Sequence, residues 1–198
     1  MELQMRTYIE DTIKHDFVEL IKTEKINTIT VDQILAPSGI NRKTFYKHFS
    51  SISDLICSIL KDNYIKKLEM PSDPLEWKEY ACHIMTKIKD NASIIERLFQ
   101  SKYSAEIRLF FHKELNIVIK NFIQGMQKKY EKQLGRPLPL SARQEDYMVK
   151  LYTPFIYSWI EEWLVTGMKE DIPEYLEAVD KIIYGGIFEC ISYFSEKT

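Results

Sequence analysis

Three cationic side chains lie within six residues of one another, at Arg42, Lys43 and Lys47, and His48 follows directly. No acidic residue interrupts the stretch 42–48. A long cationic side chain can reach a guanine edge or a phosphate of DNA, and hydroxyl groups beside it can reach phosphates. The same charges would also suit an ordinary solvated helix. The choice between these interpretations depends on the elements that hold the cluster.

The residues before the cluster predict two short helices joined by a tight turn. Thr30 is suited to cap the first helix, and Pro37 ends it, because proline cannot donate a backbone hydrogen bond and disfavours helical geometry in the preceding residue. Gly39 suits a positive φ in the turn, and Asn41 can cap a second helix over residues 42–48. This order is that of a helix-turn-helix, whose second helix enters the DNA major groove.

The second short helix has a predicted buried side. Phe45 and Phe49 are four residues apart, so they share one face, which we expect to pack on an amphipathic helix at about residues 5–23. The cationic residues are then left on the outer and flanking faces. Together with the caps and the turn, this favours DNA binding over a merely solvated helix.

The stretch from Thr30 to Leu55 resembles the N-terminal domain of the TetR family of bacterial transcriptional repressors. In that family a Thr cap, an Ile, a Gly turn and a polar cap precede the pattern Thr-(Leu/Phe)-Tyr-x-(His/Tyr)-Phe. This chain fills those positions with Thr30, Ile34, Gly39, Asn41, Thr44, Phe45, Tyr46, His48 and Phe49. The resemblance is residue-specific over about residues 8–60.

The resemblance implies that seven side chains face DNA. Arg42 and Lys43 would read base edges, whereas Thr44, Tyr46 and His48 would anchor phosphates. The full set is Thr30, Arg42, Lys43, Thr44, Tyr46, Lys47 and His48.

Several positions depart from the family pattern. Leu35 replaces a small alanine, Pro37 a helical residue and Lys43 a frequent glycine. The lysines that the family often places near Ser50 and at Ile52 to grip phosphate are missing. We therefore expect a weaker salt-dependent contribution to DNA affinity than is usual.

The composition of the chain predicts a mainly helical protein. It has 198 residues, 45% of them hydrophobic, with only 6 glycines and 7 prolines. The net charge of −2 excludes a globally basic nucleic-acid binder but not a local basic patch. We predict an all-α fold of about nine helices, with a three-helix helix-turn-helix domain at residues 1–50 and a helical regulatory and dimerisation domain at residues 51–198.

Local signals place the helices of the second domain. Ser51 and Ser141 are suited to cap helices, and the first of these should run to about Met70. The stretch Pro71–Pro74 is the clearest break, with Asp73 as the next cap, and a long helix is expected from about residue 105 to 134. Asn27 is expected to adopt a left-handed turn conformation ahead of the helix-turn-helix.

The last helix, which begins at Pro173, carries an apolar stripe wider than one internal contact needs. In the family resembled, the last two helices form a dimer, and Gly185 and Gly186 would allow close helix approach. A fully internal helix would explain the stripe as well. The segment 155–168 also resembles the dimer helix of a subset of the family from low-GC Gram-positive bacteria. The predicted dimer residues are Ile160, Trp163, Ile183, Ile187, Phe188 and Ile191.

Aromatic residues of the second domain could line a cavity for a small apolar or aromatic effector, which the resemblance implies. For each residue taken alone, an ordinary core position is the simpler interpretation. The candidates are Trp77, Tyr80, His83, Phe110, Phe111, Tyr152 and Trp159. No metal site is predicted, because no carboxylate or cysteine stands at ligand spacing beside His83 or His112.

Other classes of protein find no support in the sequence. There is no phosphate-binding glycine loop, GxSxG, HExxH or paired-cysteine motif, so neither an enzyme nor a cofactor is expected. No signal peptide or apolar span is seen, and the three separated cysteines suit a cytoplasmic protein.

We therefore predict a cytoplasmic, homodimeric repressor that binds a palindromic operator in double-stranded DNA and is released by a small-molecule effector. One alternative is the same fold under the control of a partner protein. The other is a helical enzyme or carrier with a vestigial DNA-binding head, which the missing catalytic motifs argue against.

Overall fold

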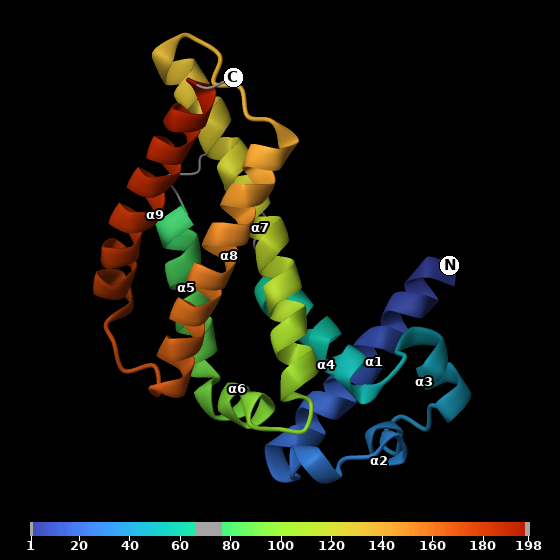
Figure 1. The fold of residues 1–198 in the computed structure, drawn as a ribbon. Helices are drawn as coiled ribbons and strands as arrows, with labels where there is room; N and C mark the ends of the chain where they lie inside the picture. Colours follow the sequence, from blue (N-terminus) through green and yellow to red (C-terminus); the bar gives the residue numbers. More distant parts are fainter. Residues whose placement is uncertain (1, 66–76, 197–198) are drawn as a thin grey trace. The chain divides into compact units, whose positions relative to one another are not determined.

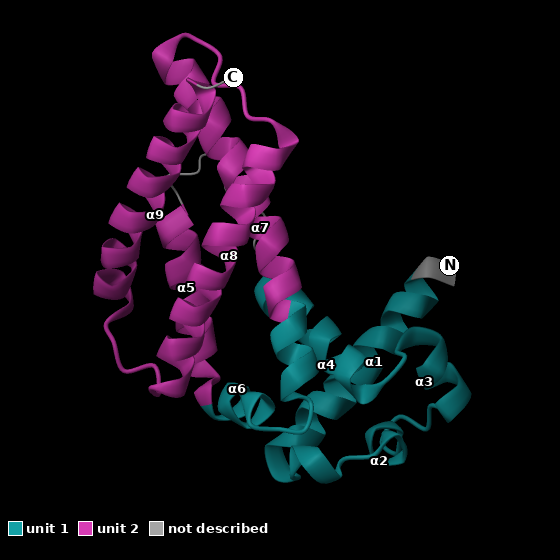
Figure 2. Cartoon of the chain, in the orientation of Figure 1, with its two compact units in different colours: residues 1–66, 93–110 teal, residues 67–92, 111–198 magenta. Residues whose placement is uncertain are grey.

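The computed structural model describes residues 2–65 and 77–196, and in this part the chain forms nine α-helices and no strand (Figure 1). The all-α prediction is therefore confirmed. The helices fall into two compact units, one of residues 1–66 with 93–110 and the other of residues 67–92 with 111–198 (Figure 2). The functional division into residues 1–50 and 51–198 stays a prediction.

The first unit holds the helix-turn-helix. Its elements are α1 (Glu2–Thr23), the 3₁₀ turn η1 (Ile26–Thr28), α2 (Val31–Leu35), α3 (Arg42–His48), α4 (Ile52–Leu60), the π-helical turn η2 (Lys61–Ile65), α6 (Ala92–Phe99) and the start of α7 (Ser104–Leu134). Their core consists of fully buried side chains from the different helices, including Ile13, Phe17, Ile34, Phe45 and Leu55.

The second unit is built from the rest of α7, α5 (Trp77–Asp90), α8 (Ala142–Val165) and α9 (Ile172–Ser195). One apolar cluster is centred on α7, α8 and α9 and includes Ile123, Met126 and Ile187. A second cluster surrounds Trp163 and includes Met85 from α5. Both apolar clusters therefore include residues of α8 and α9.

The helices begin where the predicted caps stand. Thr30 and Gln33 form a reciprocal capping box at α2, and the Asn41 side chain accepts a hydrogen bond from the Thr44 backbone N–H at 2.8 Å. Ser51 and Ser141 cap α4 and α8 in the same way. Each side-chain oxygen satisfies a backbone donor that has no partner within the helix.

Two expectations about the turns need correction or fall outside the structure. Asn27 is not left-handed; it lies in η1, and its side-chain oxygen accepts a hydrogen bond from the Lys102 backbone N–H at 2.8 Å. The α-helix that begins after Ser51 ends at Leu60 and continues as the π-helical η2. Its predicted extension to Met70 and the break at Pro71–Pro74 with Asp73 lie outside the described residues.

Candidate nucleic-acid interface

Helix α3 has one buried side and one exposed side. Phe45 is fully buried and Phe49 is almost so, and their rings lie 5.8 Å apart. On the other side Arg42, Lys43 and Lys47 are exposed. The helix is therefore held by its aromatic residues, while its cations face outward.

The exposed side of α3 also carries hydroxyl groups. Tyr46 is 52% exposed and packs the edge of its ring against Phe45 at 5.2 Å, so its hydroxyl group is held outside the core. Thr44 is half-buried at the margin of this face. Thr30 is exposed, but its hydroxyl is engaged with Gln33 in the capping box of α2.

The cations of α3 differ in what they contact. Arg42 Nη1 lies 3.4 Å from Asp32 Oδ2 of α2, and both side chains are mostly exposed. An exposed pair of this kind is worth little, so DNA can displace it. Among the described residues no carboxylate pairs with Lys43 or Lys47, which leaves these two ammonium groups available to an anionic ligand.

His48 lies in a different environment from the other predicted DNA contacts. Its side chain is only 8% exposed, and its Nδ1 lies 3.0 Å from Glu10 Oε1 of α1. An ionised carboxylate can only accept a hydrogen bond, so Nδ1–H is the donor. This hydrogen bond is the largest cause that holds the pKa of Glu10 below its ordinary value. Arg6 Nε contacts the same carboxylate oxygen at 3.1 Å.

Glu10 is a residue that the sequence did not single out. Its only local signal is the spacing of four residues from Arg6, which predicts an ordinary surface pair on a helix. Its contact with a residue 38 positions away could be found only in the folded chain.

The start of α4, which follows α3 directly in the chain, carries a negative charge. The Asp54 carboxylate accepts hydrogen bonds from the Ser50 backbone N–H at 2.8 Å and from the Ser50 hydroxyl at 3.0 Å. Ile52, the first residue of α4, is half-buried and supplies no charge. These residues form a well-capped helix start, but they add no cation to the basic face of α3.

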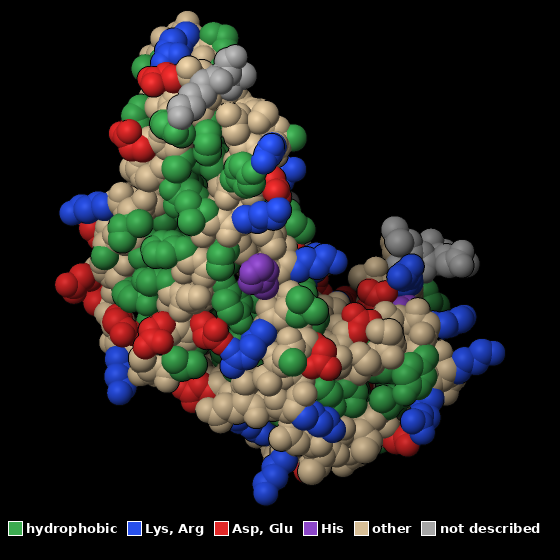
Figure 3. Space-filling view, in the orientation of Figure 1, with side chains coloured by type: hydrophobic (Ala, Val, Ile, Leu, Met, Phe, Trp, Pro, Cys, Tyr) green, Lys and Arg blue, Asp and Glu red, His purple; other side chains and the backbone are tan. Residues whose placement is uncertain are grey.

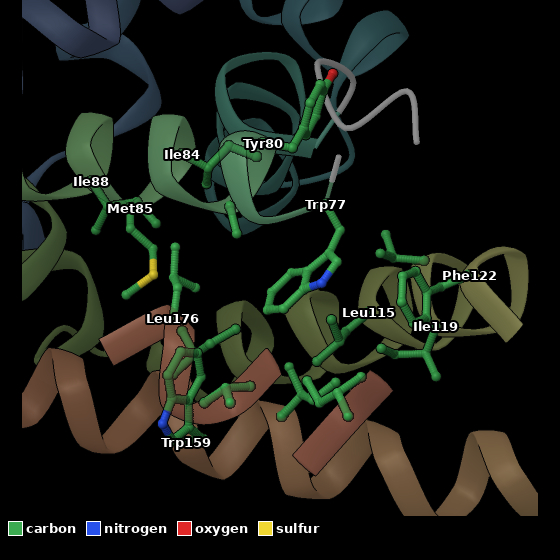
Figure 4. Close-up of a pocket in the computed structure, with 16 residues that line it drawn as sticks. Trp77, Tyr80, Ile84, Met85, Ile88, Leu115, Ile119, Phe122, Trp159 and Leu176 are labelled. Carbon is green, nitrogen blue, oxygen red and sulfur yellow. The ribbon is translucent and has the colours of Figure 1, made fainter. Parts of the chain in front are cut away.

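The second unit contains an apolar cavity of about 170 Å³ (Figure 4). Three of the predicted ligand residues, Trp77, Tyr80 and Trp159, line it. The indole N–H of Trp77 donates to Asp180 Oδ1 at 2.8 Å, and Figure 4 shows the Tyr80 hydroxyl directed away from the other lining side chains. The wall therefore consists almost wholly of carbon. The other predicted ligand residues, His83, Phe110, Phe111 and Tyr152, do not line it.

A comparison with known protein families finds a match to the C-terminal part of the chain. Residues 75–185 match a family model of the TetR type, described as a transcriptional regulator C-terminal region. The chain belongs to the TetR family of transcriptional regulators. It is therefore a regulator and not an enzyme. No curated protein matches the sequence.

A solved structure supports the same fold. It is named "Dihydroxyacetone kinase operon activator DhaS" and superposes with a TM-score of 0.60 over 93% of this chain and 97% of that one. The two sequences are 16% identical, so the likeness speaks for the TetR-family fold alone. No described helix of the regulator is long and apolar enough to cross a membrane. Nor do the described residues contain a cluster of three side chains suited to hold a metal ion.

Most residues predicted to form the dimer lie inside the regulator's own core. Trp163, Ile187 and Ile191 are fully buried and Ile183 is 4% exposed, while Ile160 and Phe188 are half-buried. The sequence pattern had identified apolar positions of α8 and α9 without separating the inner from the outer face. The large apolar side chains of α8 and α9 that are exposed are Tyr147, Leu151, Phe155, Val165, Ile182 and Tyr193. Figure 3 shows hydrophobic side chains gathered over α8 and α9 on the face in view.

The two neighbouring glycines of α9 have different surroundings. A Cβ atom at Gly186 would lie 2.7 Å from the Tyr152 hydroxyl oxygen, whereas one at Gly185 would meet nothing within 4 Å. Gly186 therefore permits close approach of α8 and α9 within one chain. Gly185 is exposed and leaves a flat site on the outer face of α9.

Proposed function

We propose that this TetR-family regulator is a cytoplasmic repressor that binds a palindromic operator as a homodimer. The observation that supports DNA binding most directly is the two-sided character of α3. Phe45 fixes the helix in the core, and Arg42, Lys43, Tyr46 and Lys47 are exposed on the opposite side. Cations and hydroxyl groups on a short, well-anchored helix are what major-groove recognition requires.

We infer that the dimer forms through the outer faces of α8 and α9. Leu151 is 61% exposed and Ile182 is 56% exposed, and such apolar side chains are stabilised by a partner surface. Gly185 on the same face would let the partner helix approach closely. A two-fold axis at this face would present two copies of α3 to half-sites about 34 Å or more apart.

Control by a small molecule would use the cavity of the second unit. A ligand there must bind better to a form of the dimer whose recognition helices are wrongly spaced, because only differential affinity shifts the equilibrium. The carbon-lined wall suits a small apolar or aromatic effector, with Trp77, Tyr80 and Trp159 in contact with it. The similar solved structure is named as an activator, so activation is the other direction of control to be tested.

A second candidate is control by a partner protein. It is favoured by the same exposed stripe of Tyr147, Leu151 and Phe155, which could dock another protein in place of a second copy. The oligomeric state of the wild-type chain separates the two proposals.

DNA binding is tested by selection of duplexes from a random pool, followed by titration of the selected duplex. The double variant Arg42→Ala/Lys43→Ala should bind it at least about thirtyfold more weakly, since each good base contact contributes about 1–3 kcal/mol. The matched control Lys132→Ala/Arg136→Ala removes two exposed cations, one in the last turn of α7 and one just after it, and should bind normally. Equal binding by both variants would exclude α3 as the reading element.

The interface is tested by sedimentation velocity. Leu151→Glu or Ile182→Glu should convert dimers to monomers without loss of helix content, because both side chains are exposed in a single chain. Leu109→Glu changes an apolar residue of the first unit that is 72% exposed and should leave the dimer intact. A wild-type chain that sediments as a monomer would favour the partner-protein proposal.

A further inference from the structure

We propose that Glu10 of α1 is a positioning residue for the recognition helix, and that it acts by holding His48, which therefore does not anchor a DNA phosphate. This inference rests on the proposed DNA binding. It assigns a role to Glu10, which neither the sequence motif nor the family match identifies. It also gives His48 a different role from the one that the family pattern implies.

The geometry around His48 favours a hydrogen bond within the protein over a contact with DNA. We call this hydrogen bond between His48 and Glu10 the tie. The imidazole is 8% exposed, while Lys43 and Lys47 of the same helix are exposed and Tyr46 is 52% exposed. Its Nδ1 is committed to Glu10 Oε1 at 3.0 Å. A side chain so enclosed would have to leave its place beside α1 to meet a phosphate.

The hydrogen bond joins the last residue of α3 to a carboxylate of α1. The carboxylate of Glu10 is also held by Arg6 at 3.1 Å. Lys14, one turn further along α1, pairs with Asp62 of η2 at 2.5 Å.

The recognition helix needs such a tie because it is short. A helix of seven residues makes fewer than about two turns and is not stable by itself in water. Phe45 and Phe49 press it onto the core, but apolar packing is non-directional. The hydrogen bond to Glu10 fixes the rotation of α3 about its axis. That rotation decides where Arg42 and Lys43 point.

A positioning role and a phosphate contact predict opposite results for Glu10→Ala, which removes the acceptor of His48 Nδ1–H. If Glu10 positions α3, the variant populates the binding-competent orientation less, and operator affinity falls about tenfold. The bound state keeps its phosphate contacts, so the slope of log K against log salt stays the same. If His48 instead grips phosphate, loss of the competing carboxylate frees the imidazole and affinity rises.

Variants of His48 provide a further test that also measures DNA binding. His48→Ala should weaken binding with an unchanged salt slope, and His48→Gln, whose amide can still donate to Glu10, should restore most of the affinity. A slope lower by about one for His48→Ala would identify a phosphate contact and overturn the proposal. The matched control is Glu19→Ala, which removes a carboxylate of α1 that pairs with Lys22 of the same helix. It should leave affinity at or slightly above the wild-type value.

A second experiment examines the protein without DNA. Its result therefore distinguishes a failure of the proposed function from a failure of this inference. NMR titration should show the Glu10 carboxyl with a lowered pKa in the wild-type protein. In His48→Ala the pKa of Glu10 should rise toward its ordinary value, and amide exchange in α3 should become faster. An unchanged Glu10 titration with unchanged exchange in α3 would overturn the tie even if the regulator binds its operator normally.

Discussion

Single residues decide how strongly the interface can attract DNA. The basic face of α3 has Lys43 and Lys47 without a carboxylate partner among the described residues, but Asp54 at the start of α4 adds a negative charge. Ile52 lies beside it at the first position of that helix. The start of α4 therefore lacks a cationic side chain for binding a phosphate, although its backbone N–H groups are properly capped.

Ile52→Lys should strengthen DNA binding and make it more dependent on salt. One added phosphate contact should steepen the slope of log K against log salt by about 0.9. The measurement is a titration of the selected duplex at several salt concentrations. Ser93→Lys, which adds the same charge at an exposed position of α6, is the control and should leave the slope unchanged. Equal slopes for wild type and Ile52→Lys would show that α4 does not reach the backbone.

Gly186→Ala should destabilise the protein by about 1–3 kcal/mol, because the new Cβ atom would overlap the Tyr152 hydroxyl group. Gly185→Ala meets open space within a single chain, so in the monomeric Leu151→Glu background it should stabilise the helix by about 0.5–1 kcal/mol. Both are measured by urea unfolding at one protein concentration. The double variant Gly186→Ala/Tyr152→Phe should recover most of the loss. A similar effect of the two alanines would mean that α8 and α9 are not in close contact at Gly186.

Residues could be predicted where their roles are local. Thr30, Gly39 and Asn41 act on backbone groups within a few positions, so their types alone foretold the caps and the turn. The partner of His48 lies 38 positions away, and no local pattern contains it. Ile187 shows the same limit, because an apolar residue on a helix does not reveal which of two apolar faces is internal.

Among the elements, α6 is tied to the end of α1 by charged side chains. Arg97 donates to the Ile21 carbonyl at 2.7 Å and also to the Glu24 carbonyl. Both carbonyls lie at or just beyond the last turn of α1, where carbonyl groups lack helical partners. Lys102 binds the Asn27 carbonyl at 2.8 Å in the turn that follows. These contacts fix the segment that leads into the helix-turn-helix.

Arg97→Ala should cost about 1–3 kcal/mol of unfolding free energy, since it removes charge-assisted hydrogen bonds from two carbonyls. Amide exchange should accelerate at the end of α1 and in η1 before it does so in α7. Lys25→Ala, an exposed change in the same segment, serves as the control and should cost less than about 0.5 kcal/mol. Uniform exchange along α1 in Arg97→Ala would refute a local role for this contact.

Helices were easier to predict than the turns between them. Side-chain caps and apolar periodicity specify a helix from within, as α3 and α8 illustrate. Asn27 failed as a left-handed residue because Lys102, from a distant part of the sequence, holds it in η1. A turn whose geometry depends on a remote partner cannot be read from its own residues.

At the scale of the whole molecule, the family assignment establishes the fold and the class of protein. The apolar cavity was only partly foreseen, because Trp77, Tyr80 and Trp159 line it whereas Phe110, Phe111 and Tyr152 do not. Aromatic type predicts burial, but which buried rings leave a void between them depends on how all the helices pack.

The cavity predicts a preference for small neutral ligands. Its volume of about 170 Å³ resembles that of an engineered apolar cavity that takes up benzene. Toluene at about a hundred times its dissociation constant should therefore stabilise the fold by about 2.7 kcal/mol, measured as a rise in Tm. Benzoate, which carries a charge, should not. Ala81→Phe, which fills the cavity, should abolish the rise, and its persistence would place the binding site elsewhere.

Base-resolved interference by guanine N7 methylation tests the central claim, that two copies of α3 read the major groove of a symmetric operator. On the selected duplex we expect interference in two half-sites related by a two-fold axis and separated by about 10 base pairs or more. It should be lost for Arg42→Ala/Lys43→Ala. Binding without N7 interference, or with interference in a single half-site, would contradict the account.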